Sequence, residues 1–295
     1  MATDLFEYAL GKLAQARDNP TLRCKICDSD ATLFDLVDFN KSCHPSLYPS
    51  GLRMIPVAYR ICSRCRFVFT DFCDGFSDEQ WREWIYNDEY VKVDPEYTSI
   101  RPLGNAREVF SFFGGHRKGV LALDYGAGNG LTASLMRRGG WTYDSFDPFG
   151  HTDMPDSRAG HYNFCSAFEV FEHSPDPAGS LEDIVHKMNP DNFVLYIGTA
   201  AHDGIVSERS RLAWWYAAPR NGHISLYSRE SLRLLARRFD LDYHPVDILR
   251  GTHLLTRGTS KQKAIAMLLR GKVTRQLRTL ARRWPAELTG APAQP

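Results

Sequence analysis

The stretch Val120-Leu-Ala-Leu-Asp-Tyr-Gly-Ala-Gly-Asn-Gly-Leu131 decides the fold of this chain. A short apolar run ends in Asp124, and alternating glycines then open a segment of helical character. Glycine is needed where φ is positive or where a ligand approaches the backbone closely. The stretch therefore predicts a strand, a tight turn and a helix N-terminus, with backbone N–H groups beside the positive end of the helix dipole.

A second strand is predicted over Trp141-Thr-Tyr-Asp-Ser-Phe-Asp147, and it too ends in a carboxylate. An acid at this place accepts hydrogen bonds from ribose hydroxyls. The glycine turn and Asp147 together indicate a cofactor that contains a nucleoside. The dinucleotide pattern G-x-G-x-x-G requires glycine where this chain has Leu131. The absence of this glycine disfavours a nicotinamide-dependent dehydrogenase. That enzyme class is kept as a rival hypothesis.

Three blocks of the sequence resemble those of class I S-adenosylmethionine-dependent methyltransferases, over roughly residues 119–248. The glycine turn, preceded by Asp124, resembles motif I of that family. The block Phe168-Glu-Val-Phe-Glu-His-Ser-Pro-Asp-Pro177 resembles the one after the fourth strand, which lines the cofactor pocket. The block Gly222-His-Ile-Ser-Leu-Tyr-Ser228 resembles a late block of sugar C-methyltransferases, whose histidine faces the acceptor, although Gly222 replaces their glutamate.

The resemblance implies an α/β fold, a Rossmann-like three-layer sandwich with a mostly parallel sheet, preceded by a small zinc-ribbon-like module. Strands are expected to end at Asp124, Asp147 and near Phe168, with a further strand over 192–199. The family usually has an extra helix and strand after the ribose acid, but only residues 148–161 intervene here, so the adenine pocket is not assigned. The expected cofactor-binding residues are Asp124, Gly126, Ala127, Gly128, Gly130, Asp147, Phe168 and Glu169.

Two C-x-x-C pairs, Cys24/Cys27 and Cys62/Cys65, precede this region. Each pair can place two thiolates on one side of a tight turn, and two pairs complete a closed tetrahedral zinc site without an open position for chemistry. Cys43 or His44, in the intervening loop, is an alternative ligand, and chance pairing of buried cysteines is the simplest alternative to a metal. We expect structural zinc, as in the sugar C-methyltransferases.

Methyl transfer to a hydroxyl needs a base, and histidine titrates near neutral pH. His223 is the first choice for the catalytic residue and His173 the second. Tyr86 and Tyr90 are expected on one helical face. The aromatic residues near Tyr86 and Tyr90, and those around Trp214, could either bind an acceptor or pack in the protein interior. The expected substrate-binding residues are Tyr86, Tyr90, Trp215, Arg220 and Asn221.

The chain is expected to fall into five segments. These are an N-terminal helix (1–20), a zinc-binding module (21–75), an aromatic-rich connection (76–118), the S-adenosylmethionine-binding domain (119–258) and a basic amphipathic helix with a tail (259–295). From residue 249 onward the chain has ten lysines or arginines and one acid, Glu287. Residues 1–248, the acidic body, therefore carry about eight more acidic than basic residues. Such a helix suits a peripheral membrane contact, a partner or packing on the acidic body.

Composition indicates a cytoplasmic location. No signal-peptide pattern opens the chain, and no apolar stretch approaches the roughly 20 residues of a membrane span. The acidic body disfavours nucleic acid as a partner. The expected activity is S-adenosylmethionine-dependent methyl transfer to a sugar or glycan, with O-methylation preferred. The alternatives are C-methylation of a nucleotide-linked keto-deoxysugar and, in a different class, a non-catalytic zinc-ribbon adaptor.

Overall fold

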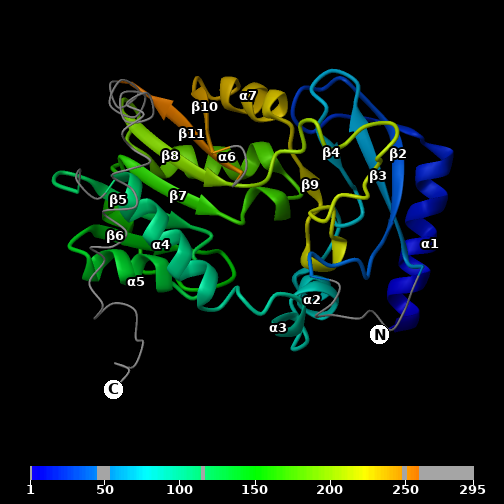
Figure 1. Ribbon diagram of the computed structural model, residues 1–295, viewed down its shortest axis with the longest axis horizontal. Helices are drawn as coiled ribbons and strands as arrows, with labels where there is room; N and C mark the ends of the chain where they lie inside the picture. Colours follow the sequence, from blue (N-terminus) through cyan, green and yellow to red (C-terminus); the bar gives the residue numbers. More distant parts are fainter. Residues whose placement is uncertain (1, 45–53, 114–116, 248–250, 259–295) are drawn as a thin grey trace. The chain divides into compact units, whose positions relative to one another are not determined.

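The computed structural model describes residues 2–44, 54–113, 117–247 and 251–258. The basic helix expected over 259–295 lies outside these residues. Figure 1 shows the helices and strands of these residues, coloured along the sequence. Internal contacts divide the chain into two units. Unit 1 combines Met1–Pro95 with Glu169–Glu182 and Gly198–Thr252, and unit 2 combines Glu96–Phe168 with Asp183–Ile197 and His253–Pro295. The chain therefore leaves unit 2 and returns to it, first after Phe168 and again after Ile197.

Unit 2 contains five strands of a six-stranded sheet, in the order β11-β8-β7-β5-β6, and the sixth strand, β10, pairs with β11. Strand β5 is parallel to β6 on one side and to β7 on the other. Asp124 is in register with Ser145 and with Ser166, so the carboxyl ends of these three strands lie at one edge. The strands are β5 (Leu121–Tyr125), β6 (Thr142–Phe146), β7 (Phe164–Phe168), β8 (Phe193–Gly198) and β11 (Thr252–Arg257).

Helices cover both faces of this sheet. Successive side chains of a strand point to opposite faces, so both faces have side chains for a helix to pack on. On one face Phe164 of β7 packs edge-on against Phe113, at the end of α4 (Ile100–Phe113), with ring centroids 4.9 Å apart. On the other face the Tyr125 hydroxyl donates to Asp183 of α6 (Pro177–Lys187) at 2.8 Å. Helix α5 (Leu131–Arg138) packs on α4, and the expected three-layer α/β fold is confirmed.

The connection between β6 and β7 contains only a 3-10 turn, Asp156–Arg158. Within the described residues no strand follows β6 in the sheet order, so β6 forms that edge. This agrees with the shortness of residues 148–161. Arg158 closes the connection because its guanidinium binds both carboxylate oxygens of Asp144, at 2.9 and 2.7 Å.

Unit 1 contains an antiparallel sheet in the order β1-β2-β3-β4-β9, with helix α1 packed on β3. Its last strand comes from a much later part of the sequence, because Val68 and Phe69 pair with Leu226 and Ser225. Helix α7 packs on β10. These elements are α1 (Ala2–Asp18), β1 (Thr21–Arg23), β2 (Asp30–Asp38), β3 (Pro56–Cys62), β4 (Val68–Phe69), β9 (Ser225–Leu226), α7 (Arg229–Arg237) and β10 (Asp242–Asp247).

The aromatic segment is a series of short turns and not one helix. Tyr86 ends the π-helix with φ −93° and ψ 39°, so it does not share a continuous helical face with Tyr90. The rings of Tyr86 and Tyr90 nevertheless meet edge-on at 5.0 Å. The turns are α2 (Asp78–Gln80), the π-helix η1 (Trp81–Ile85) and α3 (Tyr90–Val93). Among the described residues, no helix is long and apolar enough to cross a membrane.

Candidate active site and metal centre

The turn after β5 has the backbone that its glycines predict. Gly126, Gly128 and Gly130 have φ of 73°, 55° and 73°, a region that other residues rarely adopt. A Cβ on Gly130 would lie 2.5 Å from the ring of His151, whereas a Cβ on Gly128 would meet no atom within 4 Å. The turn is therefore closed by protein at Gly130 and open at Gly128.

Asp147 is bonded to the glycine turn. Its Oδ2 accepts the Gly128 N–H at 2.7 Å, and its Oδ1 accepts the Phe149 N–H at 2.8 Å. The His151 N–H donates to the Gly128 carbonyl at 2.7 Å, so residues 147–151 form a second wall of the turn. The Phe149 side chain is 77% exposed there. The sequence interpretation did not name Phe149, although its place two residues after the acid was a signal.

Asp124 is a buried carboxylate. Its Oδ1 accepts the Ser166 hydroxyl at 2.6 Å, and Ser166 in turn accepts the Tyr143 hydroxyl at 2.7 Å. Burial raises the pKa of Asp124 to about 7, and the charge of Asp147 adds to the effect. The other expected cofactor residues of unit 2 lie at the same strand ends, with Ala127 buried in the turn and Phe168 packed edge-on against Tyr196.

A group of acids and histidines, which we call the Glu/His cluster, forms within unit 1. Its ligand atoms all lie within 4.8 Å of one another. Glu169 is the first residue after β7 and has φ of 55°, an unusual value for glutamate. Its N–H donates to the Gly198 carbonyl at 3.0 Å. The cluster consists of Glu169, Glu172, His173 and His223.

Glu172 is the most buried member of the cluster, with no exposed surface. Its Oε1 accepts the Tyr216 hydroxyl at 2.5 Å, while Oε2 is buried without a hydrogen-bond partner among the described residues. Burial and the nearby Glu169 raise the pKa of Glu172 to about 8. The sequence interpretation named neither Glu172 nor Tyr216 as a site residue, although Glu172 belongs to the quoted methyltransferase-like block.

The two histidines are held at a defined orientation. His223 is 2% exposed, and its Nδ1 lies 2.8 Å from the Tyr216 carbonyl oxygen, so we assign the proton to Nδ1. Its Nε2 is then the acceptor nitrogen. The His173 ring lies edge-on to His223 at 4.9 Å, and its Nδ1 is 3.4 Å from the Tyr86 hydroxyl.

Gly222 makes room for this arrangement. Its φ is 85°, and a Cβ there would lie 2.9 Å from His173 Nδ1 and 3.4 Å from Ile85 Cγ2. A larger side chain at this position would therefore displace His173.

The expected substrate residues have different environments. Arg220 is buried, and its guanidinium donates to the Ile85 carbonyl at 2.7 Å and to the Asn87 Oδ1 at 2.9 Å. Asn221 is also buried, and its Oδ1 accepts the Cys43 N–H at 2.9 Å. These bonds hold the chain that leads to His223. By contrast, Tyr86 and Trp215 are exposed.

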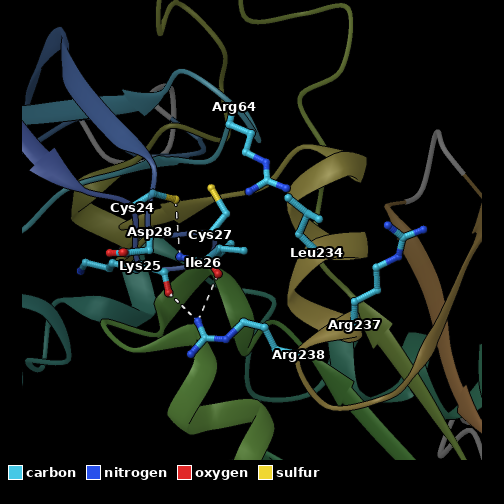
Figure 2. Close-up of a pocket in the computed structure, with 9 residues that line it drawn as sticks. All are labelled: Cys24, Lys25, Ile26, Cys27, Asp28, Arg64, Leu234, Arg237 and Arg238. Atoms are coloured by element: carbon cyan, nitrogen blue, oxygen red, sulfur yellow. Dashed lines mark hydrogen bonds between the residues drawn. The ribbon is translucent and has the colours of Figure 1, made fainter.

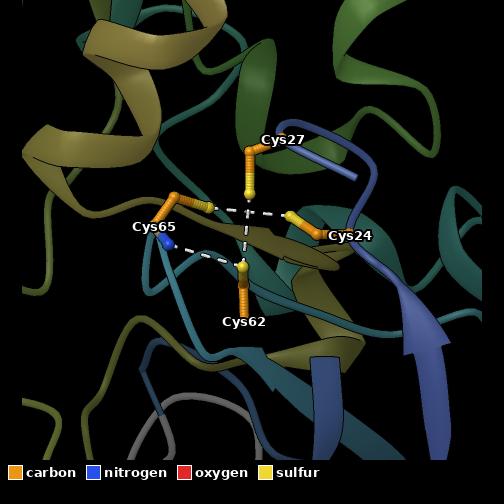
Figure 3. A group of neighbouring side chains, drawn as sticks. All are labelled: Cys24, Cys27, Cys62 and Cys65. Carbon is orange, nitrogen blue, oxygen red and sulfur yellow. Dashed lines mark hydrogen bonds between the residues drawn. The ribbon is translucent and has the colours of Figure 1, made fainter. Parts of the chain in front are cut away.

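The four cysteines of the two C-x-x-C pairs meet in unit 1, with their sulfurs directed to a common point (Figure 3). Cys24 Sγ lies 3.6 Å from Cys65 Sγ, and Cys27 Sγ lies 3.4 Å from Cys62 Sγ. Zinc–sulfur bonds of about 2.3 Å in a tetrahedron place sulfurs ~3.8 Å apart. The spacing and the donor set therefore fit zinc. Cys43 is elsewhere, with its sulfur 3.7 Å from His223 Nδ1, and His44 is not in the cluster.

The two cysteine turns have the same local geometry. Asp28 and Arg66, which follow the second cysteine of each pair, have positive φ of 57° and 62° where glycine is common. Each donates its N–H back to the carbonyl of the first cysteine, at 3.0 and 3.2 Å. The Ile26 and Cys65 N–H groups also point at the first sulfurs, at 3.5 and 3.4 Å.

A pocket lies beside the first cysteine turn within unit 1 (Figure 2). Arg238 forms part of its wall and donates to the Lys25 and Ile26 carbonyls at 3.2 and 3.1 Å. The basic side chains outnumber the acids on the lining. The lining residues are Cys24, Lys25, Ile26, Cys27, Asp28, Arg64, Leu234, Arg237 and Arg238.

Comparisons with known proteins find one matching family model and several similar solved structures. A family model described as a methyltransferase domain matches residues 97–246. No curated protein matches the chain.

Among solved structures, magnesium protoporphyrin IX methyltransferase from Synechocystis PCC 6803 is similar at 12% identity and a TM-score of 0.36, over 63% of this chain and 95% of that one. The plantazolicin methyltransferase BpumL is similar at 17% identity and a TM-score of 0.42, over 68% and 88%. The mitomycin 7-O-methyltransferase MmcR is similar at 14% identity and a TM-score of 0.45, over 63% and 62%.

The burial of Asp124 predicts a pH-dependent effect of Asp124→Asn. The folded pKa of about 7 lies above the unfolded value near 3.9, so the native state loses stability as pH rises through this window. Asparagine cannot ionise, so it removes the free-energy cost of a buried charge at this position. At pH 8 the variant, without cofactor, should be more stable by roughly 1 to 4 kcal/mol, and at pH 4 it should show no gain.

Urea unfolding at both pH values measures this difference, with the exposed Asp156→Asn as control. An equal effect of Asp124→Asn at pH 4 and pH 8 would show that Asp124 ionises normally.

Proposed function

We propose that this chain, which belongs to the methyltransferase-domain family, transfers the methyl group of S-adenosylmethionine to a hydroxyl of a sugar or glycan. Family membership supports the expected enzyme class, a methyltransferase, over the dehydrogenase. S-adenosylmethionine as the methyl donor is part of this proposal. The acceptor is inferred from the Glu/His cluster, which begins one residue after β7 and brings carboxylates and an imidazole acceptor nitrogen together.

Unit 2 offers groups for each part of the cofactor. Asp147 has lone pairs beyond those that accept the two N–H groups, and these can accept ribose hydroxyls. The buried Asp124 carboxylate favours a ligand with positive charge, which the amino-acid part and the sulfonium supply. The exposed Phe149 ring offers a face to adenine. The open space at Gly128 admits the cofactor close to the backbone.

The reaction is a displacement at the methyl carbon, so the protein mainly aligns the two molecules and prepares the nucleophile. A sugar hydroxyl is a poor nucleophile at neutral pH, and removal of its proton speeds the reaction. His223 is the first candidate to accept that proton, because its Nδ1 is bonded to the Tyr216 carbonyl and Nε2 is the basic nitrogen. His173 is the second. Tyr86 and Trp215, which are exposed, are proposed as aromatic contacts of the acceptor. Tyr90 was expected to join them, but it is buried and its hydroxyl donates to the Asn221 carbonyl at 3.3 Å.

The four clustered cysteines are proposed to hold structural zinc. Four thiolates complete the tetrahedron, so this ion would stabilise unit 1 without binding the acceptor. The free energy of zinc binding at such a site contributes directly to the folding free energy.

The acceptor is tested by incubating the protein with S-adenosylmethionine and a panel of nucleotide sugars and glycans. Mass spectrometry detects the gain of one methyl group, and NMR of the product distinguishes a methyl on oxygen from one on carbon. A methyl on carbon would select the alternative, C-methylation of a nucleotide-linked keto-deoxysugar. The absence of any methylated sugar would reject this acceptor class.

Gly128→Val should abolish cofactor binding while unit 2 stays folded. The added side chain would enter the open space at the turn, and a β-branched residue resists a φ of 55°. Calorimetry with S-adenosylhomocysteine measures the binding. Gly160→Val is the matched control, because Gly160 has φ of 80° and equally open space away from the turn. Wild-type affinity in Gly128→Val would place the cofactor elsewhere.

Cys62→Ser should lower the zinc content and destabilise unit 1, with cofactor affinity retained. The reason is that one of four closely spaced thiolates is lost. Elemental analysis and thermal unfolding are the measurements. Cys73→Ser controls for the loss of a buried thiol, since Cys73 is buried outside the cluster. A zinc-free wild-type protein would rule out the metal.

His223→Asn should lower the rate of methyl transfer by about 10²–10⁴-fold and leave cofactor affinity unchanged. Asparagine retains a polar group but no basic nitrogen. Single-turnover rates with labelled cofactor measure the effect. His202→Asn serves as control, because His202 is buried in unit 1 and its Nε2 binds the Arg66 carbonyl outside the cluster. Normal turnover in His223→Asn would make His223 a structural residue.

A further inference from the structure

We propose that the Glu/His cluster is a second metal site, which binds a divalent ion such as Mn²⁺ independently of the cysteines. All four residues belong to unit 1, and their ligand atoms lie within 4.8 Å of one another. Oxygen and nitrogen ligands about 2.0–2.2 Å from one ion are separated by roughly 3 to 4.4 Å. The cluster therefore needs only small side-chain rotations to close on an ion.

The unpartnered oxygen of Glu172 is the observation that points to a ligand. Oε2 is fully buried and has no hydrogen-bond partner among the described residues, whereas Oε1 is fixed by the Tyr216 hydroxyl. Buried polar atoms are normally paired, and an orphan one requires an explanation such as an ion. A cation in the cluster would provide the missing partner for Oε2.

Tyr216 orients two of the four ligands at once. Its hydroxyl donates to Glu172 Oε1, and its carbonyl accepts the His223 Nδ1–H, so that Glu172 Oε2 and His223 Nε2 are the atoms that would bind the ion. Metal-binding histidines characteristically donate their other N–H to a carbonyl or carboxylate, and ligating carboxylates are themselves hydrogen-bonded. Tyr216 supplies both supports and is therefore a positioning residue of this site.

The donor set separates this site from the cysteine cluster. Four thiolates select zinc, whereas two carboxylates and two imidazoles suit a harder ion such as Mn²⁺, which often takes six ligands. Four protein ligands would then leave positions for water or for a substrate oxygen. Glu169 and His173 are half-buried, so the cluster is not sealed from solvent on their side.

For the proposed function, on which this step rests, the ion would bind the acceptor hydroxyl oxygen and lower its pKa. The hydroxyl proton passes to water, the oxygen forms a bond to the methyl carbon, and the carbon–sulfur bond breaks. The electron pair remains on sulfur, which gives S-adenosylhomocysteine. His223 would then act as a ligand and not as the base.

The test measures Mn²⁺ binding to the full-length protein by electron paramagnetic resonance after EDTA treatment and desalting, with zinc content checked. Wild type should bind one Mn²⁺. Glu172→Gln should weaken binding at least about tenfold, since an amide oxygen can still accept the Tyr216 hydroxyl but carries no charge. The matched control Glu208→Gln, at a carboxylate that is 74% exposed, should bind like wild type.

Tyr216→Phe provides a second variant that removes no ligand. It should weaken Mn²⁺ binding about tenfold, because Glu172 loses its orienting bond. Equal dissociation constants in wild type, Glu172→Gln and Tyr216→Phe would overturn the site, as would the absence of Mn²⁺ binding to wild type.

Activity separates this inference from the proposed function. If variant-sensitive Mn²⁺ binding is found and no sugar is methylated, the metal site stands and the acceptor class fails. If EDTA-treated enzyme methylates a sugar as fast as Mn²⁺-loaded enzyme, the ion has no role in transfer and His223 remains the base.

Discussion

Left-handed backbone in the turns that carry the proposed site residues is the constraint on which the functional groups of this chain depend. A residue with positive φ turns the chain sharply, so that N–H groups or a side chain face a ligand and not the sheet. Glycine adopts this conformation at Gly126, Gly128 and Gly222 without strain. Glu169 adopts it at φ 55° with a side chain, at a cost of order 1–2 kcal/mol. Such strain persists where the surrounding structure holds the residue, and it concentrates at functional sites.

Buried carboxylates are the second common element of the two units. Asp124 and Glu172 are both nearly inaccessible to water, and each has only part of its hydrogen-bonding capacity satisfied by neutral hydroxyls. Burying a charge without a cation costs stability. A cationic ligand offsets that cost, and the methyl donor carries positive charge. If these carboxylates bind the proposed cationic ligands, their burial lowers the stability of the ligand-free protein and favours binding of those ligands.

Local motifs explain which features the sequence predicts. Strands β5, β6 and β7 end at Tyr125, Phe146 and Phe168, each within one residue of the end that the sequence predicts. These strands and the meeting of two C-x-x-C pairs follow from patterns of a few residues each. The missed features depend on contacts far apart in sequence. Tyr216 and Glu172 are 44 residues apart and are joined by one hydrogen bond, which no periodic pattern in the sequence predicts. Arg220 was expected to bind the substrate, but its guanidinium is buried and donates to the Ile85 carbonyl, 135 residues away in the sequence. A contact this distant cannot be predicted from composition.

The connectivity suggests how acceptor choice is separated from cofactor binding. The chain passes from unit 2 to unit 1 after β7 and again after β8, and both departures occur at the carboxyl ends of strands. Ligands bind at these ends in open α/β sheets. The first departure carries Glu169, Glu172 and His173, and the second carries His223. Residues proposed to meet the acceptor thus belong to segments that fold with the N-terminal sheet, while the cofactor turn folds with the parallel strands. Acceptor-binding segments of this kind can change in sequence without altering the strands that hold the cofactor, because specificity resides in connections more than in the scaffold.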